Sequence, residues 1–374
     1  MRVAFYAPMK PPDHSTPSGD RRMARLLIAA LSAAGHKVTI ACRFRSRDTG
    51  DRRRQQRIAE IGSRLADGLL KRYREKPAHE HPQAWFTYHL YYKAPDYLGL
   101  RICDALRIPY IVAEASHADK RAGTQFAAGH EAAAQAIRRA DALIVINAAD
   151  LEGLQRIADP SRCHRLLPFI DKRTAMMHSR AEARAALARE LKLPENEPWI
   201  LAVAMMRAPD KLASYRILAE AMRRLRELPW RLLLVGDGPE REATLAAFAP
   251  LASRVTFAGL KSAEDIARFH AAADIFAWPA INEAYGMAIL EAQASGVPVI
   301  AGASGGVPEI VADGDTGLLC SPGDAVAFAD ALATLLQNPT LRERMGRAAA
   351  QRVSELHGFS AAAAKLDEIL KRVT

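Results

Sequence analysis

The chain has 374 residues, 49% hydrophobic and 25% charged, with a formal net charge of +10. This length favours two domains, and the composition is that of a soluble globular protein. No apolar run approaches the ~20 residues of a membrane span, and residues 1–8 are too short and too polar for a signal peptide, so we expect a cytoplasmic protein.

The chain opens with a strand, a helix and a strand. Residues 2–6 predict the first strand, a helix runs from Gly19 to about Ala34, and residues 37–42 predict the second strand. This order predicts a parallel sheet. No G-x-G-x-x-G follows the first strand, which argues against a dinucleotide-dependent enzyme.

Residues 43–76 form a basic segment with twelve Lys and Arg against five Asp and Glu. Its apolar residues recur at helical spacing: Ile58, Ile61, Leu65, Leu69 and Leu70. One interpretation is a helix packed on the sheet with a solvated Arg face. The other is a peripheral contact with an anionic membrane on its inner, cytoplasmic face.

Candidate metal ligands do not form a recognisable site. His79, His81 and His89 fit no standard zinc spacing, and the four cysteines stand singly, so neither a zinc site nor a disulfide framework is expected. Asp313 and Asp315 lie in a polar turn of the second half, where we expect no metal role.

Further strands are expected at residues 85–88, 110–113 and 142–146, and a second parallel sheet starts at residues 199–204. His117 follows the strand of residues 110–113 and is expected near its carboxyl end. Arg207 and Lys211 lie in the loop after the strand of residues 199–204. Fixed cations there could stabilise phosphoryl oxygens that gain charge.

The most informative stretch, residues 282–317, reads NEAYGMAILEAQASGVPVIAGASGGVPEIVADGDTG. It follows a predicted strand at residues 275–278, and a helix runs from Met287 to about Ser295. Ligands of open α/β sheets bind at the carboxyl ends of the strands, and a helix N-terminus there attracts phosphate. Glu283 lies before this helix and Glu291 about two turns (~3.6 residues each) within it. Two carboxylates flanking a phosphate site suit a nucleotide-diphospho-sugar.

This stretch resembles the retaining glycosyltransferases of family 4, also called group 1, which have the GT-B fold. The resemblance rests on Glu283-x7-Glu291 and on the AQASGVPVIA, GGVPEIV and DGDTGLL runs that follow. It implies an α/β protein of two Rossmann-like parallel-sheet domains facing across a cleft. It also implies metal-independent transfer of a sugar, with retention, from a nucleotide-diphospho-sugar donor to an acceptor such as a glycan, a lipid-linked sugar or a small molecule.

The resemblance also assigns roles to residues. Arg207 and Lys211 hold the diphosphate, Glu283 and His117 contact the transferred sugar, Glu291 binds the ribose, and Gly19 lets the backbone approach the donor phosphate. The remaining donor contacts are expected from the backbone near Leu260 and Lys261 for the base, and from Ala284, Tyr285, Gly286 and Met287 at the helix start. No cofactor or metal is expected.

The resemblance predicts four parts in the chain. These are an acceptor-side domain at residues 1–172, a linker at 173–197, a nucleotide-sugar domain at 198–356, and a C-terminal helix at 357–374 that returns to the first domain.

Two alternative functions remain open. A sugar-nucleotide epimerase of related two-domain fold would convert the donor without an acceptor. A basic nucleic-acid-binding protein would explain the charge but not the Gly and Glu block, and no aromatic stacking platform interrupts the basic segment, so we expect no nucleic acid partner.

Overall fold

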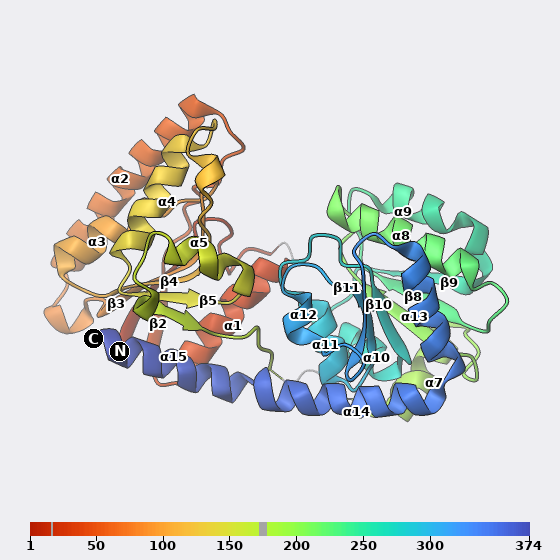
Figure 1. The fold of residues 1–374 in the computed structure, drawn as a ribbon. Helices are drawn as coiled ribbons and strands as arrows, with labels where there is room; N and C mark the ends of the chain where they lie inside the picture. The colour runs from red at the N-terminus through yellow and green to blue at the C-terminus, as the bar shows by residue number, and fades with distance from the viewer. Residues whose placement is uncertain (16–17, 172–177) are drawn as a thin grey trace. The chain divides into compact units, whose positions relative to one another are not determined.

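A computed structural model describes residues 1–15, 18–171 and 178–374 and divides the chain into two compact units (Figure 1). Unit 1 comprises Met1–Leu167 and Phe359–Thr374, and unit 2 comprises Pro168–Gly358. The strands are β1 Arg2–Tyr6, β2 Lys37–Cys42, β3 Ala84–Leu90, β4 Tyr110–Ala115, β5 Ala142–Val145, β6 Cys163–Arg165, β7 Trp199–Val203, β8 Arg231–Val235, β9 Val255–Gly259, β10 Ile275–Trp278, β11 Val299–Gly302 and β12 Gly317–Cys320. The α-helices are α1 Gly19–Ala33, α2 Arg52–Arg74, α3 Gly99–Leu106, α4 Ala127–Arg139, α5 Leu151–Gln155, α7 Arg180–Leu191, α8 Asp210–Arg224, α9 Arg241–Phe248, α10 Ala263–Ala272, α11 Met287–Ala294, α12 Val307–Ile310, α13 Ala325–Gln337, α14 Pro339–Leu356 and α15 Phe359–Val373.

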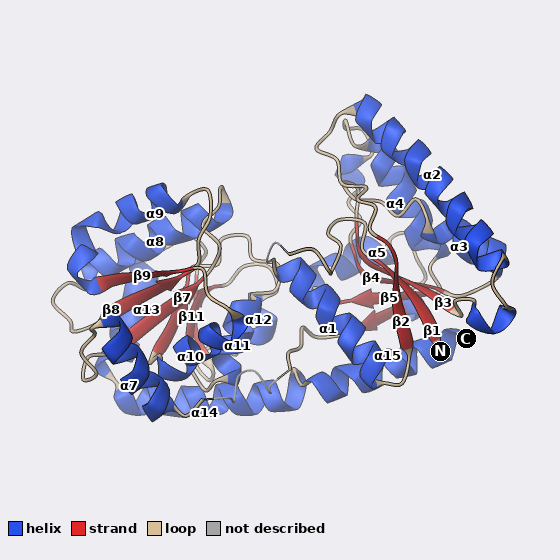
Figure 2. Ribbon diagram, turned by 180° about the vertical axis from the view of Figure 1, so that it is seen from behind, coloured by secondary structure: helices blue, strands red, loops and turns tan. Residues whose placement is uncertain are grey.

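Unit 1 is built on a six-stranded parallel sheet in the order β2-β1-β3-β4-β5-β6. Helices cover both faces, with α1 packed against α15 and with α3 in contact with both α2 and α4 (Figure 2). The strands β3, β4 and β5 are almost wholly buried, as expected for parallel strands covered on both faces.

Unit 2 repeats this plan around a second six-stranded parallel sheet in the order β12-β11-β10-β7-β8-β9. The helix α8 contacts α13 and α9, while α10 contacts α7 and α11, and α11 contacts α14. The predicted fold class, an α/β protein with two Rossmann-like parallel-sheet domains, is confirmed. The carboxyl edge of each sheet is where such folds bind ligands.

The region predicted as a linker, residues 173–197, is structured wherever it is described. Residues 178–197 contain α7, which packs against α10 in unit 2. Asp274 fixes α7 by accepting hydrogen bonds from Arg180 and Arg184, at 2.6 and 2.7 Å, and from the backbone N–H of Trp199 at 2.7 Å. The linker prediction is therefore wrong for this part, because sequence alone does not show that the Arg side chains of a polar helix have a buried partner. Residues 173–177 lie outside the described part of the chain.

The two boundaries between the units lie close together within unit 2. His357 Nδ1 donates a hydrogen bond to the carbonyl of Pro168 at 2.6 Å, and Ile170 N donates to the carbonyl of His357 at 3.1 Å. The chain then continues into α15, which packs against α1 in unit 1.

The basic segment forms α2, which lies on the outside of unit 1 beside α3 (Figure 1). Ile58, Leu69 and Leu70 are buried, whereas Arg53, Arg57 and their basic neighbours are exposed. The structure thus favours the packed-helix interpretation for the apolar face. Among the described residues, no helix is both long and apolar enough to cross a bilayer.

Candidate active site

Lys211 and Glu283 meet at the carboxyl edge of the second sheet. Lys211 lies in the first turn of α8 after β7, Glu283 lies in the loop after β10, and β7 and β10 are neighbours. The Lys211 ammonium forms an ion pair with the Glu283 carboxylate, and both side chains are about four-fifths buried, at 19% and 18% exposed. The indole Nε1 of Trp278 donates to the same carboxylate oxygen at 3.4 Å. The fold thus brings together two predicted site residues that are distant in sequence.

Hydrogen bonds fix the loop that carries Glu283. Asn282 Nδ2 donates to Asp210 Oδ2 at 3.0 Å, which ties the loop to the start of α8. Glu283 N donates to Ser304 Oγ at 3.0 Å, and that hydroxyl donates to the carbonyl of Ala280. The carboxylate therefore projects from a backbone that is held on both sides.

Two glycines of the GGVPEIV run allow this loop to approach β11. A Cβ on Gly305 would overlap the carbonyl oxygen of Glu283, and one on Gly306 would press on that of Ala284. Gly306 N donates to the Ala284 carbonyl at 3.0 Å. Glycine at these two positions therefore lets the segment after β11 lie against the backbone of the Glu283 loop.

The helix α11 begins at this loop. Gly286 precedes it in the left-handed conformation at φ +69°, which suits glycine. Tyr285 and Met287 are buried and Ala284 is exposed. The first backbone N–H groups of a helix have no intrahelical acceptor, so this end can bind an anion.

Glu291 lies in the second turn of α11 and is only 8% exposed. Its Oε2 is 3.9 Å from Nε2 of His270, which lies in the last turn of α10 and is 1% exposed. The His270 ring also lies against Phe276, with centroids 5.6 Å apart. A buried carboxylate needs an opposite charge or hydrogen bonds, and the His270 ring is a basic group close enough to serve as a partner.

Arg207 is exposed in the loop between β7 and α8 that also leads to Lys211. The loop packs closely against the turn of residues 236–239, which reads GDGP. A Cβ on Gly236 would overlap the Ala204 carbonyl, and one on Gly238 would overlap the Met206 carbonyl. Both glycines have positive φ, +141° and +156°. The turn therefore has a structural role in shaping the loop.

Leu260 and Lys261 follow the edge strand β9 at the same end of the sheet. Leu260 is 57% exposed, which is unusual for a large apolar side chain. The next residue, Ser262, caps α10 by accepting a hydrogen bond from Asp265 N at 3.1 Å.

Gly19 begins α1 in unit 1, and Ser18 caps this helix by accepting from Arg21 N at 3.2 Å. A Cβ on Gly19 would meet no protein atom within 4 Å, and its φ does not require glycine. The chain itself therefore gives no steric reason for glycine at this position.

His117 lies after β4, but its side chain is only 4% exposed. Its Nε2 is 3.1 Å from Asp119 Oδ1, and its ring lies 4.7 Å from that of His130 on α4. These contacts are all within unit 1.

Sequence reasoning missed Trp278, Ser304 and His270 as neighbours of the two glutamates. Trp278 belongs to an apolar strand and His270 is a single histidine in a helix, so neither forms part of a recognisable motif. Ser304 contacts the Glu283 loop only through hydrogen bonds between its hydroxyl and the backbone. Only the tertiary fold reveals these contacts.

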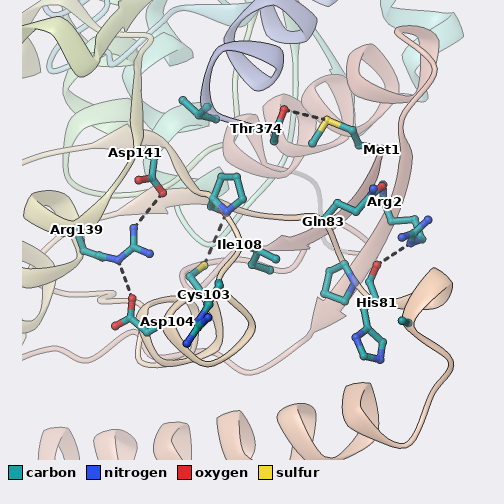
Figure 3. Close-up of a pocket in the computed structure, with 15 residues that line it drawn as sticks. Met1, Arg2, His81, Gln83, Cys103, Asp104, Ile108, Arg139, Asp141 and Thr374 are labelled. Atoms are coloured by element: carbon teal, nitrogen blue, oxygen red, sulfur yellow. Dashed lines mark hydrogen bonds and ion pairs between the residues drawn. The ribbon is translucent and has the colours of Figure 1, made fainter.

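A cavity of about 960 Å³ in unit 1 lies at the opposite, amino-terminal edge of the first sheet (Figure 3). Its lining includes Arg139, whose guanidinium bonds Asp104 at 2.7 Å and Asp141 at 3.0 Å. Because parallel sheets bind ligands at their carboxyl edge, we do not assign the site to this cavity.

Comparisons with known proteins find similarity to glycosyltransferases. Residues 184–352 match the family model described as glycosyl transferases group 1. Two curated relatives named D-inositol 3-phosphate glycosyltransferase are similar: the protein of Nocardioides sp., at 34% identity over 58% of this chain and 50% of its own length, and that of Xylanimonas cellulosilytica, at 32% over 64% and 59%. The chain thus spans between half and three-fifths of the length of these relatives.

Solved structures resemble the chain over its whole length. Sucrose-phosphate synthase from Thermosynechococcus elongatus has a TM-score of 0.77 at 23% identity, covering 99% of this chain and 98% of that chain. Anabaena HepE in complex with UDP and glucose has a TM-score of 0.74 at 17% identity, covering 99% of both chains. At these identities the likeness concerns the fold, and it confirms the predicted GT-B fold class.

Proposed function

We propose that this protein, whose residues 184–352 match the family model of group 1 glycosyl transferases, moves a sugar from a nucleotide-diphospho-sugar to an acceptor. The names of the curated relatives and the UDP complex of HepE support this activity. The observation that carries the proposal is the meeting of Lys211 and Glu283 beside the start of α11, at the carboxyl edge of the second sheet.

The donor's diphosphate would bind to Lys211, Arg207 and the first N–H groups of α11. Lys211 is paired with Glu283 before the donor binds, so a phosphate would take over the ammonium and release the carboxylate for sugar hydroxyls. Charge-assisted bonds of this kind are stronger than neutral ones, and fixed cations stabilise the diphosphate as it departs.

The remaining predicted residues complete the donor site in this proposal. Glu291, held beside His270, binds the ribose hydroxyls, and the exposed turn of Leu260 and Lys261 receives the base. The open space above Gly19 allows the backbone to approach the donor. A direct contact of His117 with the sugar stays a prediction, since its side chain faces Asp119 and His130.

The proposed reaction retains the anomeric configuration and needs no metal. Arg207 and Lys211 supply the positive charge at the diphosphate, and the leaving phosphate takes the acceptor's proton on the same face, as the family resemblance implies. The acceptor and the cytoplasmic location remain predictions.

Incubation with UDP-, GDP- and ADP-glucose, without acceptor and in excess EDTA, tests the function. A glycosyltransferase slowly transfers the sugar to water, so we expect free glucose of retained configuration and one nucleoside diphosphate. An epimerase would release neither and would instead accumulate an isomeric sugar nucleotide. Loss of turnover in EDTA that Mg²⁺ restores would contradict metal independence.

A further inference from the structure

Titratable side chains from five segments meet at the carboxyl edge of the first sheet. His89 in β3 lies with its Nδ1 3.5 Å from Asp20 Oδ1 in α1 and 3.5 Å from Glu114 Oε1 in β4. Lys10 forms an ion pair with Asp20. Asp150, in the 3₁₀ turn Ala148–Asp150 after β5, adds a third carboxylate that interacts with Glu114 and His89. We call His89, Asp20, Glu114, Asp150 and Lys10 the His89 cluster.

For two members of the cluster, neighbouring charges outweigh the effect of burial on the pKa. Burial lowers the pKa of His89, but Glu114 and Asp20 outweigh this effect and raise it. Burial likewise opposes ionisation of Asp20, yet His89 and Lys10 hold the pKa of its carboxyl far below the usual range. Both shifts favour the ionised forms of the His89–Asp20 pair.

Asp150 is the exception. Burial and the nearby Glu114 raise its pKa to about 6, and His89 compensates only in part. At neutral pH the fold therefore holds Asp150 ionised, partly buried and close to a like charge. This arrangement opposes stability, as is common for groups that serve a ligand.

The backbone at this edge is also unusual. His89 and Glu114 have positive φ values of +63° and +56°, which side chains of this size rarely adopt. They face each other across β3 and β4, because Tyr88 pairs with Ala113 and Leu90 with Ala115. Matched left-handed residues in adjacent strands turn both side chains toward one place, and such conformations concentrate at functional sites.

The surroundings of the cluster are suited to a sugar-like ring. The ring of Tyr91 lies 5.3 Å from that of His89 and 5.3 Å from that of Tyr92, and both tyrosines are partly exposed. The space above Gly19, next to Asp20, is open. Carboxylates accept hydrogen bonds from neighbouring hydroxyl groups, and an aromatic ring offers an apolar face to ring C–H groups.

We propose that the His89 cluster and Tyr91 bind the sugar acceptor, which presents a neutral polyhydroxylated ring, a sugar or a cyclitol. The cluster's three carboxylates outnumber its two cations, and each cation already faces a carboxylate, so a phosphorylated ring is disfavoured here. This inference rests on the proposed function, which requires an acceptor.

The test is binding of neutral and phosphorylated rings to the full-length chain. We would measure saturation-transfer NMR and calorimetry with methyl α-D-glucopyranoside, myo-inositol and myo-inositol 1-phosphate. We expect a neutral ring to bind, and Asp150→Asn and Glu114→Gln each to weaken binding about tenfold, the loss of one hydrogen bond to a charged group. Asp67→Asn, which removes an exposed carboxylate paired with Arg101 in the same unit, should leave binding unchanged.

Three outcomes would overturn the inference: no neutral ring binds, only the phosphorylated ring binds, or both variants bind like the parent. A thermal shift with UDP, GDP and ADP separates this failure from that of the proposed function. Nucleotide binding without ring binding removes only the acceptor site. Ring binding that depends on Asp150 without any nucleotide binding supports a polyol site but removes the transferase proposal.

Discussion

At the scale of single residues, the chemistry of the donor site depends on pairs. Lys211 is paired with Glu283, and Glu291 with His270, so each glutamate has a basic partner. Both pairs place a basic side chain beside a largely buried carboxylate, which would be costly to bury without a partner. In the proposed function, both glutamates accept hydrogen bonds from hydroxyls of the donor.

We expect His270 to affect nucleotide binding indirectly, by holding the Glu291 carboxylate in position for the ribose hydroxyls. The parent protein should bind its preferred nucleoside diphosphate about tenfold more tightly than the 2′-deoxy form, because a carboxylate positioned for a hydroxyl is left unpaired when that hydroxyl is missing. His270→Leu should bring the ratio of the two dissociation constants close to one, and His270→Gln should restore part of it. Calorimetry measures this ratio.

Glu291→Gln provides the comparison for this experiment. A merely structural role for His270 would lower the melting temperature and leave the ratio unchanged. An unchanged ratio in His270→Leu, together with a reduced ratio in Glu291→Gln, would show that His270 does not position the carboxylate.

Asp150 should make the protein less stable as pH rises. Its raised folded-state pKa of about 6 means that its contribution to stability is complete below pH 4 and is lost as pH rises through 6. The asparagine of Asp150→Asn cannot ionise, so the free energy of unfolding at pH 7.5 should exceed that of the parent by up to about 3 kcal/mol. The difference should be smaller at pH 4, and denaturant unfolding at the two pH values measures both. Glu114 and His89 face this carboxyl, and both stay unchanged in the variant. Equal stability of parent and variant at both pH values would contradict the strained environment.

At the scale of elements, the apolar runs identified most strands, including β1, β2 and β10 with their observed bounds. This succeeded because strands covered on both faces are continuously apolar. The short β6 and β12 were missed, since three or four residues leave little periodicity. The helix α7 was predicted as linker, because its anchor Asp274 is far away in sequence.

The basic helix α2 offers only charge to a membrane, because its apolar positions are buried. We therefore expect the protein to co-sediment at low salt with vesicles of equal parts phosphatidylcholine and phosphatidylglycerol, and to be released at high salt. Each exposed basic residue near such a surface contributes about 1 kcal/mol. Replacement of the exposed Arg53, Arg57 and Arg64 by Glu should abolish sedimentation.

The matched control replaces three exposed arginines of unit 2 by Glu: Arg216, Arg226 and Arg241. If the control variant loses sedimentation with the vesicles to the same extent as the α2 variant, net charge rather than α2 attracts the protein. No sedimentation of the parent at low salt would remove the membrane contact.

At the scale of the whole molecule, the sequence predicted the fold class, because the spacing of Gly and Pro residues reflects where the backbone must turn or approach closely. Gly305 and Gly306, for example, are required by the approach of the Glu283 loop. The His89 cluster could not be predicted in this way. Its members come from two strands, one helix, a 3₁₀ turn and a loop, and only the parallel register brings His89 and Glu114 together.

The central claim is that Lys211 and Glu283 form the donor site. The most direct measurement is the rate of nucleoside diphosphate release from the preferred sugar nucleotide by Lys211→Ala and Glu283→Ala, with Arg268→Ala as a control that breaks the partly exposed Arg268–Glu190 pair of the same unit. We predict a loss of about 100-fold or more for each site variant, with unchanged melting behaviour, and full activity for the control. Full activity in either site variant would contradict the account.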